Sequence, residues 1–199
     1  MNPLVYLDTE TTGLDPTIHD IWEIAYAVDD GPIHSAIVRH SLTFADPTAL
    51  AVSRYYDRTG GGDPPTATTR WFELTLRDLL DGATLVGANP AFDAAMLYAR
   101  WGQAPWHFRL LDIEAYAMGT LGYDLPRGLA TITRDLRARG YDIPEPDHSA
   151  AADVAATRAC HLALVDLYRR LGVTPMAEPT ICDSCGRPIR ETGECSCSD

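Results

Sequence analysis

Apolar runs separated by polar turns predict three strands at the start of the chain. Residues 4–7, Leu-Val-Tyr-Leu, form an uninterrupted apolar run of the kind that buried strands have. Residues 21–28 and 33–42 follow as two further candidates, separated only by the turn Asp-Asp-Gly-Pro at 29–32. Strands joined by so short a connection pair antiparallel, so we expect the first three strands to form a meander.

Helical spacing of apolar residues dominates the rest of the chain. The pattern predicts helices over residues 48–56, 68–80, 91–100, 113–118, 129–139 and 149–171. Asp46 and Pro47 are typical of a helix start, and Gly82, Gly140 and Gly172 of helix ends. Short apolar strands at 84–87 and 109–112 lie between helices. This order predicts an α/β protein, with a mixed sheet covered by helices on both faces.

The composition changes after Gly172. We expect one folded domain over residues 1–172, and a linker with a Cys-rich tail over residues 173–199. No apolar run approaches the roughly 18 residues of a membrane span, and the N-terminus lacks the basic and apolar regions of a signal peptide. We therefore expect a cytoplasmic protein that does not contact a membrane.

The formal net charge of −12 argues against an ordinary nucleic-acid-binding surface, which is basic. One exception is a site where bound divalent cations reverse the local charge. Asp8 and Glu10 suggest such a site, because they directly follow the first apolar run. Side chains two residues apart leave the same face of a strand, and two carboxylates so close need a cation or a shared proton.

Two later segments also carry acids where a helix begins. Asp93 lies in the first turn expected after Asn89-Pro90, and Asp153 lies near the start of the longest helix, five residues after His148. Together with the first pair, these segments resemble the three motifs of the DEDDh group of DnaQ-like 3′–5′ exonucleases. The matching residues are Asp8-Thr9-Glu10 with the following Thr-Thr-Gly-Leu, Asn89 with Phe92-Asp93, and His148 with Asp153. The resemblance covers residues 4–171 in order and spacing.

The resemblance implies a ribonuclease-H-like fold and a metal-dependent exonuclease. Such an enzyme would hydrolyse phosphodiester bonds at the 3′ ends of single-stranded or frayed DNA and release nucleoside 5′-monophosphates. By resemblance, Asp8, Glu10, Asp93 and Asp153 would hold two Mg²⁺ or Mn²⁺ ions, and His148 would be the general base.

The same resemblance implies which residues contact the 3′-terminal nucleotide. They are Thr11, Thr12, Leu14 and Asn89. Many relatives have His-Asn where this chain has Ala88-Asn89, a departure that affects an auxiliary contact and not the metal site.

Other functions stay open at this point. The first motif looks more like the proofreading members than like oligoribonuclease, which favours DNA and a separate polymerase as partner. The same fold could instead act on RNA, or serve as an inactive module that recruits a partner. The acids also have structural readings, as strand-end acids or as first-turn acids that the helix dipole favours. For Glu23, inside the second strand, we expect a structural hydrogen-bonding role.

The tail carries four cysteines in two closely spaced pairs. A C-x₂-C pair precedes a tighter C-x-C pair, and the residues are Cys182, Cys185, Cys195 and Cys197. This pattern fits one structural Zn²⁺, and it also fits a flexible tail with free thiols.

Overall fold

The computed structural model describes residues 2–61 and 66–172. The chain divides into two compact units, Met1–Leu167 and Tyr168–Asp199, and the sheet belongs to the first. The linker, the tail and its four cysteines fall outside the described residues. Within the described ranges, no helix is both long and apolar enough to cross a bilayer.

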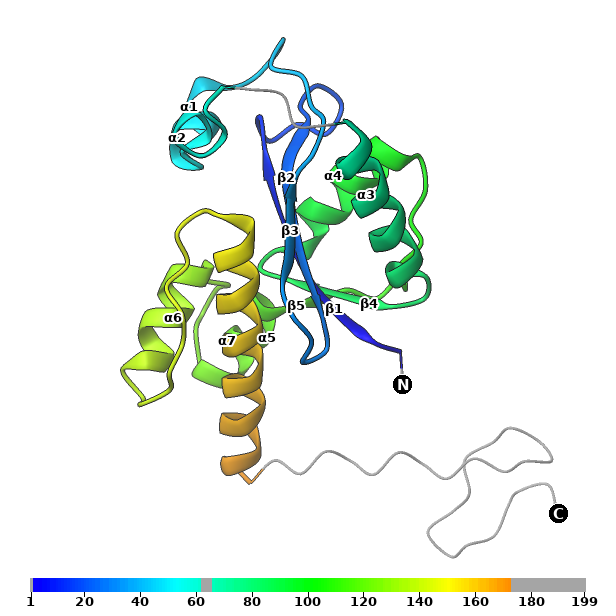
Figure 1. Ribbon diagram of the computed structural model, residues 1–199. Coiled ribbons are helices and arrows are strands. Elements are labelled where there is room, and N and C mark those ends of the chain that lie inside the picture. The colour runs from blue at the N-terminus through cyan, green and yellow to red at the C-terminus, as the bar shows by residue number, and fades with distance from the viewer. Residues whose placement is uncertain (1, 62–65, 173–199) are drawn as a thin grey trace, which may run out of the picture. The chain divides into compact units, whose positions relative to one another are not determined.

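The centre of the fold is a five-stranded sheet with the strand order β3-β2-β1-β4-β5. The strands are β1 (Leu4–Thr11), β2 (Ile21–Val28), β3 (His34–Ile37), β4 (Thr84–Gly87) and β5 (Leu111–Asp112). β1, β2 and β3 form the expected antiparallel meander, whereas β1, β4 and β5 run parallel (Figure 1). The mixed sheet is therefore confirmed.

The third strand is shorter than its apolar pattern predicted. It ends at Ile37, one residue before a last main-chain contact with β2, in which the N–H of Val38 donates to the carbonyl of Trp22 at 2.8 Å. Further along, the N–H of Ser41 donates to the carboxylate of Asp20 at 2.8 Å. Residues 38–42 thus cross toward the first helix instead of extending β3.

The described residues form seven helices. They are α1 (Pro47–Val52), α2 (Tyr55–Thr59), α3 (Thr66–Leu80), α4 (Pro90–Trp101), α5 (Ile113–Leu121), α6 (Leu129–Arg137) and α7 (Ala150–Arg170). The single helix predicted over 48–56 is wrong, because the chain breaks there into α1 and α2. Ser53 ends α1, and Arg54 has a left-handed φ of 54°, which no helical residue adopts.

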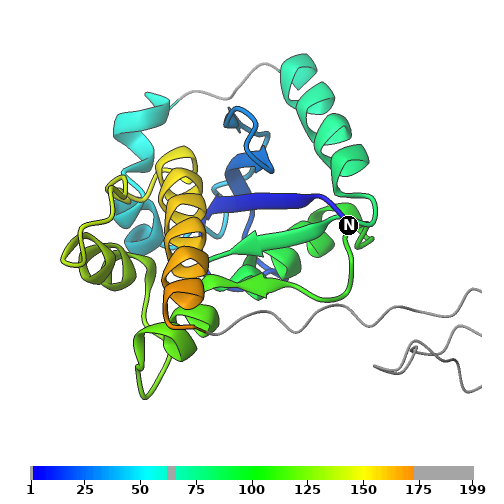
Figure 2. The same ribbon diagram turned by 90° about the horizontal axis from the view of Figure 1, so that it is seen from below.

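The helices cover both faces of the sheet, as the sequence predicted (Figures 1 and 2). α3 and α4 lie on one face, where Val5 and Leu7 of β1 join their core. α5, α6 and α7 lie on the other face, and Tyr6 joins that core. Because side chains alternate along a strand, Asp8 and Glu10 share the α7 face with Tyr6, and Thr9 shares the α4 face.

β1 extends beyond its parallel neighbour. It pairs with β4 only from Leu4 to Tyr6, although its antiparallel pairing with β2 continues to Thr11. The end of β1 that carries the acids is therefore an open edge on the β4 side, and its main-chain donors there need other partners.

The pairing of β1 with β2 contains a bulge at Trp22. Glu10 pairs with Glu23, but Thr11 pairs with Ile21, so Trp22 is an extra residue on β2. A bulge changes the alternation of side chains. Ile21 and Ile24 both join the core under α3 and α4, whereas Trp22 and Glu23 both contact residues of the α1–α2 segment.

Candidate active site

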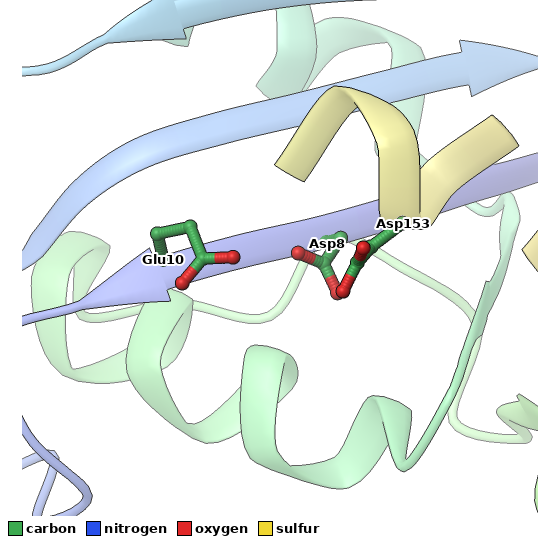
Figure 3. A group of neighbouring side chains, drawn as sticks. All are labelled: Asp8, Glu10 and Asp153. Carbon is green, nitrogen blue, oxygen red and sulfur yellow. The ribbon is translucent and has the colours of Figure 1, made fainter. Parts of the chain in front are cut away.

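Three carboxylates meet at the end of β1. Asp8 and Glu10 come from the strand, and Asp153 comes from the first turn of α7. One oxygen of each lies within 4.8 Å of the others. Figure 3 shows all three side chains on the same side of β1, with the carboxylates of Asp8 and Asp153 facing one another. The structure thus brings together three of the four acids that the sequence singled out.

Asp93 reaches the same strand from the opposite face. It is only 3% exposed, and it accepts hydrogen bonds from the N–H of Thr9 at 2.9 Å and from the Thr9 hydroxyl at 2.6 Å. This contact satisfies a main-chain donor on the open edge of β1. Asp93 is outside the 4.8 Å group, yet its charge raises the pKa values of Asp8 and Glu10.

The site contains more carboxylates than cationic side chains. Burial raises the pKa of Asp8 well above its ordinary value, and the carboxylates of Asp93, Asp153 and Glu10 raise it further. Burial and the neighbouring acids Asp153 and Glu23 raise the pKa of Glu10 to about 8, against the opposing effect of Arg58. Burial also raises the pKa of Asp153. A bound cation would remove this cost.

The donor set fits hard divalent cations. All three members of the group are carboxylates, and oxygen-only sites suit Mg²⁺ or Mn²⁺. Asp8, Glu10 and Asp153 are the residues that could hold such ions directly. Asp93 stands behind them with its carboxylate bound to Thr9.

The turn before α7 holds Asp153 in place. The N–H of Asp147 donates to Asp153 at 3.1 Å, and the N–H of Ser149 donates to Asp147 at 3.0 Å. The Ser149 hydroxyl accepts the N–H of Ala152 at 3.3 Å, as an N-capping residue does.

His148 is exposed in this turn and has a left-handed φ of 60°. Its charge opposes the rise in the pKa of Asp153, so the imidazole lies in the field of the acidic group. It does not belong to the three-residue group itself.

Arg58 links the site to the α1–α2 segment, and no sequence motif pointed to it. Its guanidinium forms an ion pair with Glu23, donates to the carbonyl of His148 at 3.2 Å, and lies 4.8 Å above the ring of Trp22. Glu23 also accepts the N–H of Ala150, the first residue of α7, at 3.0 Å. The expected structural role of Glu23 is confirmed. A carboxylate inside a buried strand requires a cationic partner, but the pattern could not name Arg58.

The two threonines after Glu10 use their hydroxyls within the loop. Thr11 donates to the carbonyl of Gly13 at 2.7 Å, and Thr12 accepts the N–H of Asp20 at 2.9 Å. Both side chains are buried. They shape the loop that follows β1, and their role toward a nucleotide stays a prediction.

Leu14 is 77% exposed and lines a pocket of about 300 Å³ beside Glu10. Val52 and Phe92 line the same pocket, so its wall is largely apolar. Asn89 lies at the start of α4, with a φ of 59°, and its N–H donates to Asp112 at 3.3 Å. Its side chain is exposed, and its predicted contact with a nucleotide is not tested by this geometry.

The chain matches no family model, and no curated protein is similar to it in sequence. Solved structures do resemble it. Exonuclease I of E. coli matches with a TM-score of 0.64 at 19% identity over 86% of this chain, and its complex with a dA16 oligonucleotide matches with 0.63 at 18% identity over 86%. The protein shares the fold of exonuclease I.

A second neighbour with the exonuclease fold is smaller. Brucella melitensis NrnC bound to pGG matches with a TM-score of 0.53 at 19% identity, over 86% of this chain and 76% of NrnC. By contrast, this chain spans only 43% of exonuclease I. The ribonuclease-H-like fold that the three motifs implied is thereby confirmed.

Proposed function

We propose that this protein is a metal-dependent 3′–5′ exonuclease acting on single-stranded or frayed 3′ ends. The observation that carries the proposal is the convergence of Asp8, Glu10 and Asp153 within 4.8 Å at the end of β1, in a chain with the exonuclease fold. Asp93 contributes from the other face of the strand. A buried group of acids with raised pKa values is costly in itself, which supports a functional origin.

Each residue has a role that its position supports. Asp8, Glu10 and Asp153 would hold Mg²⁺ or Mn²⁺, and these ions supply a Lewis acid for the phosphodiester and lower the pKa of a water. Asp93 supports β1 by accepting both donors of Thr9. His148, exposed beside Asp153, would accept the proton of the attacking water as the general base. Attack of that water on phosphorus would break the P–O3′ bond, so the released nucleotide would keep its 5′-phosphate and the shortened strand would end in a 3′-hydroxyl.

The pocket beside Glu10 fits the last nucleotide of the strand. Leu14, Val52 and Phe92 offer apolar surface, and bases stack on such surfaces irrespective of sequence. Leu14 would wedge against the terminal base. Thr11 would hold the terminal nucleotide through the backbone of the loop. An apolar pocket next to an acidic group accommodates a nucleoside whose phosphate points toward bound cations.

A second candidate is an exonuclease for short oligonucleotides, including RNA. NrnC, which was solved bound to pGG, matches over 76% of its own length, whereas exonuclease I matches over only 43%. The size of this chain thus favours a substrate like that of the smaller neighbour, NrnC, whereas the first motif favours DNA. A separate polymerase as partner, and two structural alternatives for the tail, stay predictions.

The test is degradation of 5′-labelled 12-nucleotide DNA and RNA strands, and of a dinucleotide, in Mg²⁺, Mn²⁺ or chelator. We expect stepwise shortening from the 3′ end that chelator abolishes and that Asp8→Asn removes. Asp30→Asn, an exposed acid in the turn between β2 and β3, is the matched control and should retain activity. Metal-independent shortening, or full activity in Asp8→Asn, would contradict the proposal. The ratio of rates on DNA, RNA and the dinucleotide separates the two candidates.

A further inference from the structure

An arginine-rich pocket is lined mainly by α3 and the C-terminal end of α4. The pocket has a volume of about 350 Å³ and is lined by Arg39, Arg70, Arg77, Arg100 and Glu73. These charged residues sum to a net charge of +3, in a chain whose net charge is −12. A second pocket of about 590 Å³ adjoins it and shares Arg39, Glu73 and Arg100. We call the first of these the arginine pocket.

Glu73 does not neutralise the arginine pocket, because its charge is already paired. Both of its oxygens accept from Arg100, at 2.7 Å each, and one also accepts the indole N–H of Trp101 at 3.0 Å. Burial raises the pKa of Glu73, but these hydrogen bonds outweigh burial and keep it below the ordinary value. The ion pair of Glu73 and Arg100 is therefore a fixed part of the pocket wall.

The other three arginines, Arg39, Arg70 and Arg77, form no ion pair within the described ranges. Arg39 and Arg70 are exposed, and Arg77 lies 5.8 Å from the ring of Trp101. The charge of Arg77 acts on Glu73, but Glu73 is already bound to Arg100, so the pocket keeps a net positive charge. In a protein with an excess of acids, such a pocket favours an anionic ligand. The planar guanidinium matches the geometry of phosphate oxygens.

α4 connects the arginine pocket to the pocket beside Glu10. Phe92 lines the pocket beside Glu10, and Arg100 lies in the arginine pocket. Phe92, Met96 and Arg100 are four residues apart in succession and so share one stripe of the helix. Met96 and Arg100 of this stripe also line a small pocket of about 150 Å³, together with the loop after β1.

The length of this path suits a strand of nucleic acid. Eight residues of helix separate Phe92 from Arg100, which corresponds to a rise of about 12 Å. A stacked strand rises about 3.4 Å per nucleotide, so the arginine pocket lies roughly three or four nucleotides from the terminal one.

We propose that the arginine pocket binds the phosphodiester backbone of the substrate upstream of its 3′ end. The inference rests on the proposed exonuclease function for the identity of the strand, whereas the charge and the geometry of the pocket stand independently of it. Binding there would anchor long strands against an otherwise acidic surface. Substrates too short to span the path would gain nothing from it.

The test compares strands of two lengths. Fluorescence anisotropy in Mg²⁺ would measure the binding of 5′-labelled 12-nucleotide and 3-nucleotide strands, as DNA and RNA, with phosphorothioate linkages at the 3′ end to prevent cleavage. The variant is Arg39→Glu with Arg70→Glu, and Arg39→Gln with Arg70→Gln is the milder version. The charge-matched control is Arg109→Glu with Arg127→Glu, two exposed arginines away from this pocket.

We expect the pocket variant to bind the 12-nucleotide strands at least about tenfold more weakly. The slope of log K against log salt concentration should become shallower by about 1.4, or about 0.7 per lost phosphate contact. Binding of the 3-nucleotide strands should not change, and the control should bind both lengths normally. The proposal would be overturned if the pocket variant bound the 12-nucleotide strands as tightly as the unaltered protein does. It would also be overturned if the control lost as much affinity as the pocket variant. Weaker binding by the pocket variant, without shortening of unmodified strands by the unaltered protein, would refute the exonuclease alone. Shortening by the unaltered protein, with equal binding by the pocket variant, would refute this inference alone.

Discussion

The carboxylate of Asp93 accepts both hydrogen-bond donors of Thr9, the main-chain N–H at 2.9 Å and the hydroxyl at 2.6 Å. Thr9 lies between the two acids of β1, on the opposite face of the strand. Asp93 therefore fixes the segment that carries Asp8 and Glu10, at the edge where β4 no longer pairs with β1.

Replacing Thr9 tests this support. Thr9→Val removes the hydroxyl donor from a buried carboxylate, whose pKa burial raises to about 7 while the Thr9 hydrogen bonds oppose that rise. We expect the free energy of unfolding in chelator at pH 8 to fall by about 2 kcal/mol, the usual range for a hydrogen bond to a charged group. The loss should shrink below pH 6, where Asp93 is protonated. Denaturant titration would measure both values, and Thr9→Ser is the control that keeps the hydroxyl.

The metal-free protein should lose stability as the pH rises. The pKa of Glu10 is raised from 4.5 to about 8, so the folded state retains a proton that the unfolded chain has already released. The contribution of Glu10 to the free energy of unfolding is thus complete below pH 4.5 and lost as the pH rises through 8. Thermal denaturation in chelator from pH 5 to 9 would measure this slope.

Divalent ions should reverse that trend, because they bind the ionised carboxylates. At a concentration of 100 times its Kd, a bound ion adds about 2.7 kcal/mol to the free energy of unfolding. The gain should be larger at pH 8 than at pH 5.5. An equal effect of Mg²⁺ or Mn²⁺ at both pH values would contradict the assignment of the site.

Neutralising one acid should separate stability from activity. Asp8→Asn removes a buried acid on which four other carboxylates act, so the metal-free protein should become more stable at pH 8. The exonuclease rate should fall roughly 10²-fold or more, as when a group that stabilises transition-state charge is lost. Thermal shift assays and the labelled-strand assay measure the two effects. Destabilisation in chelator would show that Asp8 is instead a partner in a structural network.

Arg58 should influence catalysis without contacting the substrate. Arg58→Ala leaves Glu23 with its buried charge unpaired, and we expect a loss of about 3 kcal/mol in the free energy of unfolding. Adding Glu23→Gln should recover much of that loss, because Gln is neutral and still accepts the N–H of Ala150.

Arg58→Lys is the more informative variant for activity. It retains a positive charge beside Glu23 but loses the fork that also reaches the carbonyl of His148. We expect kcat to fall about tenfold, with little change in KM or in the stabilisation by metal. An unchanged kcat would mean that the position of His148 does not depend on Arg58.

Local patterns predicted most elements of this fold. The apolar run of β1 and the period of two placed Asp8 and Glu10 on one face, and the capping residue Asp46 placed the start of α1, where it accepts the N–H of Thr48. These features depend on neighbours within a few residues. The patterns missed the end of the third strand at Ile37 and the break at Arg54.

Long-range pairings could not be predicted in the same way. Thr9 and Asp93 are 84 residues apart, and Arg58 and His148 are 90 residues apart. Periodicity assigns a residue to a face but does not choose its partner across the fold. The motifs brought Asp93 and Asp153 to the same site only through resemblance, whereas Arg58, which belongs to no motif, was missed.

The bulge at Trp22 has a consequence for anyone who would redesign this sheet. A regular β2 would pair more fully with β1 and would place Trp22 and Glu23 on opposite faces, so they could no longer share Arg58. Sequences optimised for ideal strand pairing here would gain regularity at the expense of the turn that carries His148. Stabilised versions of this protein should therefore be sought among changes that keep residues 21–24 as they are.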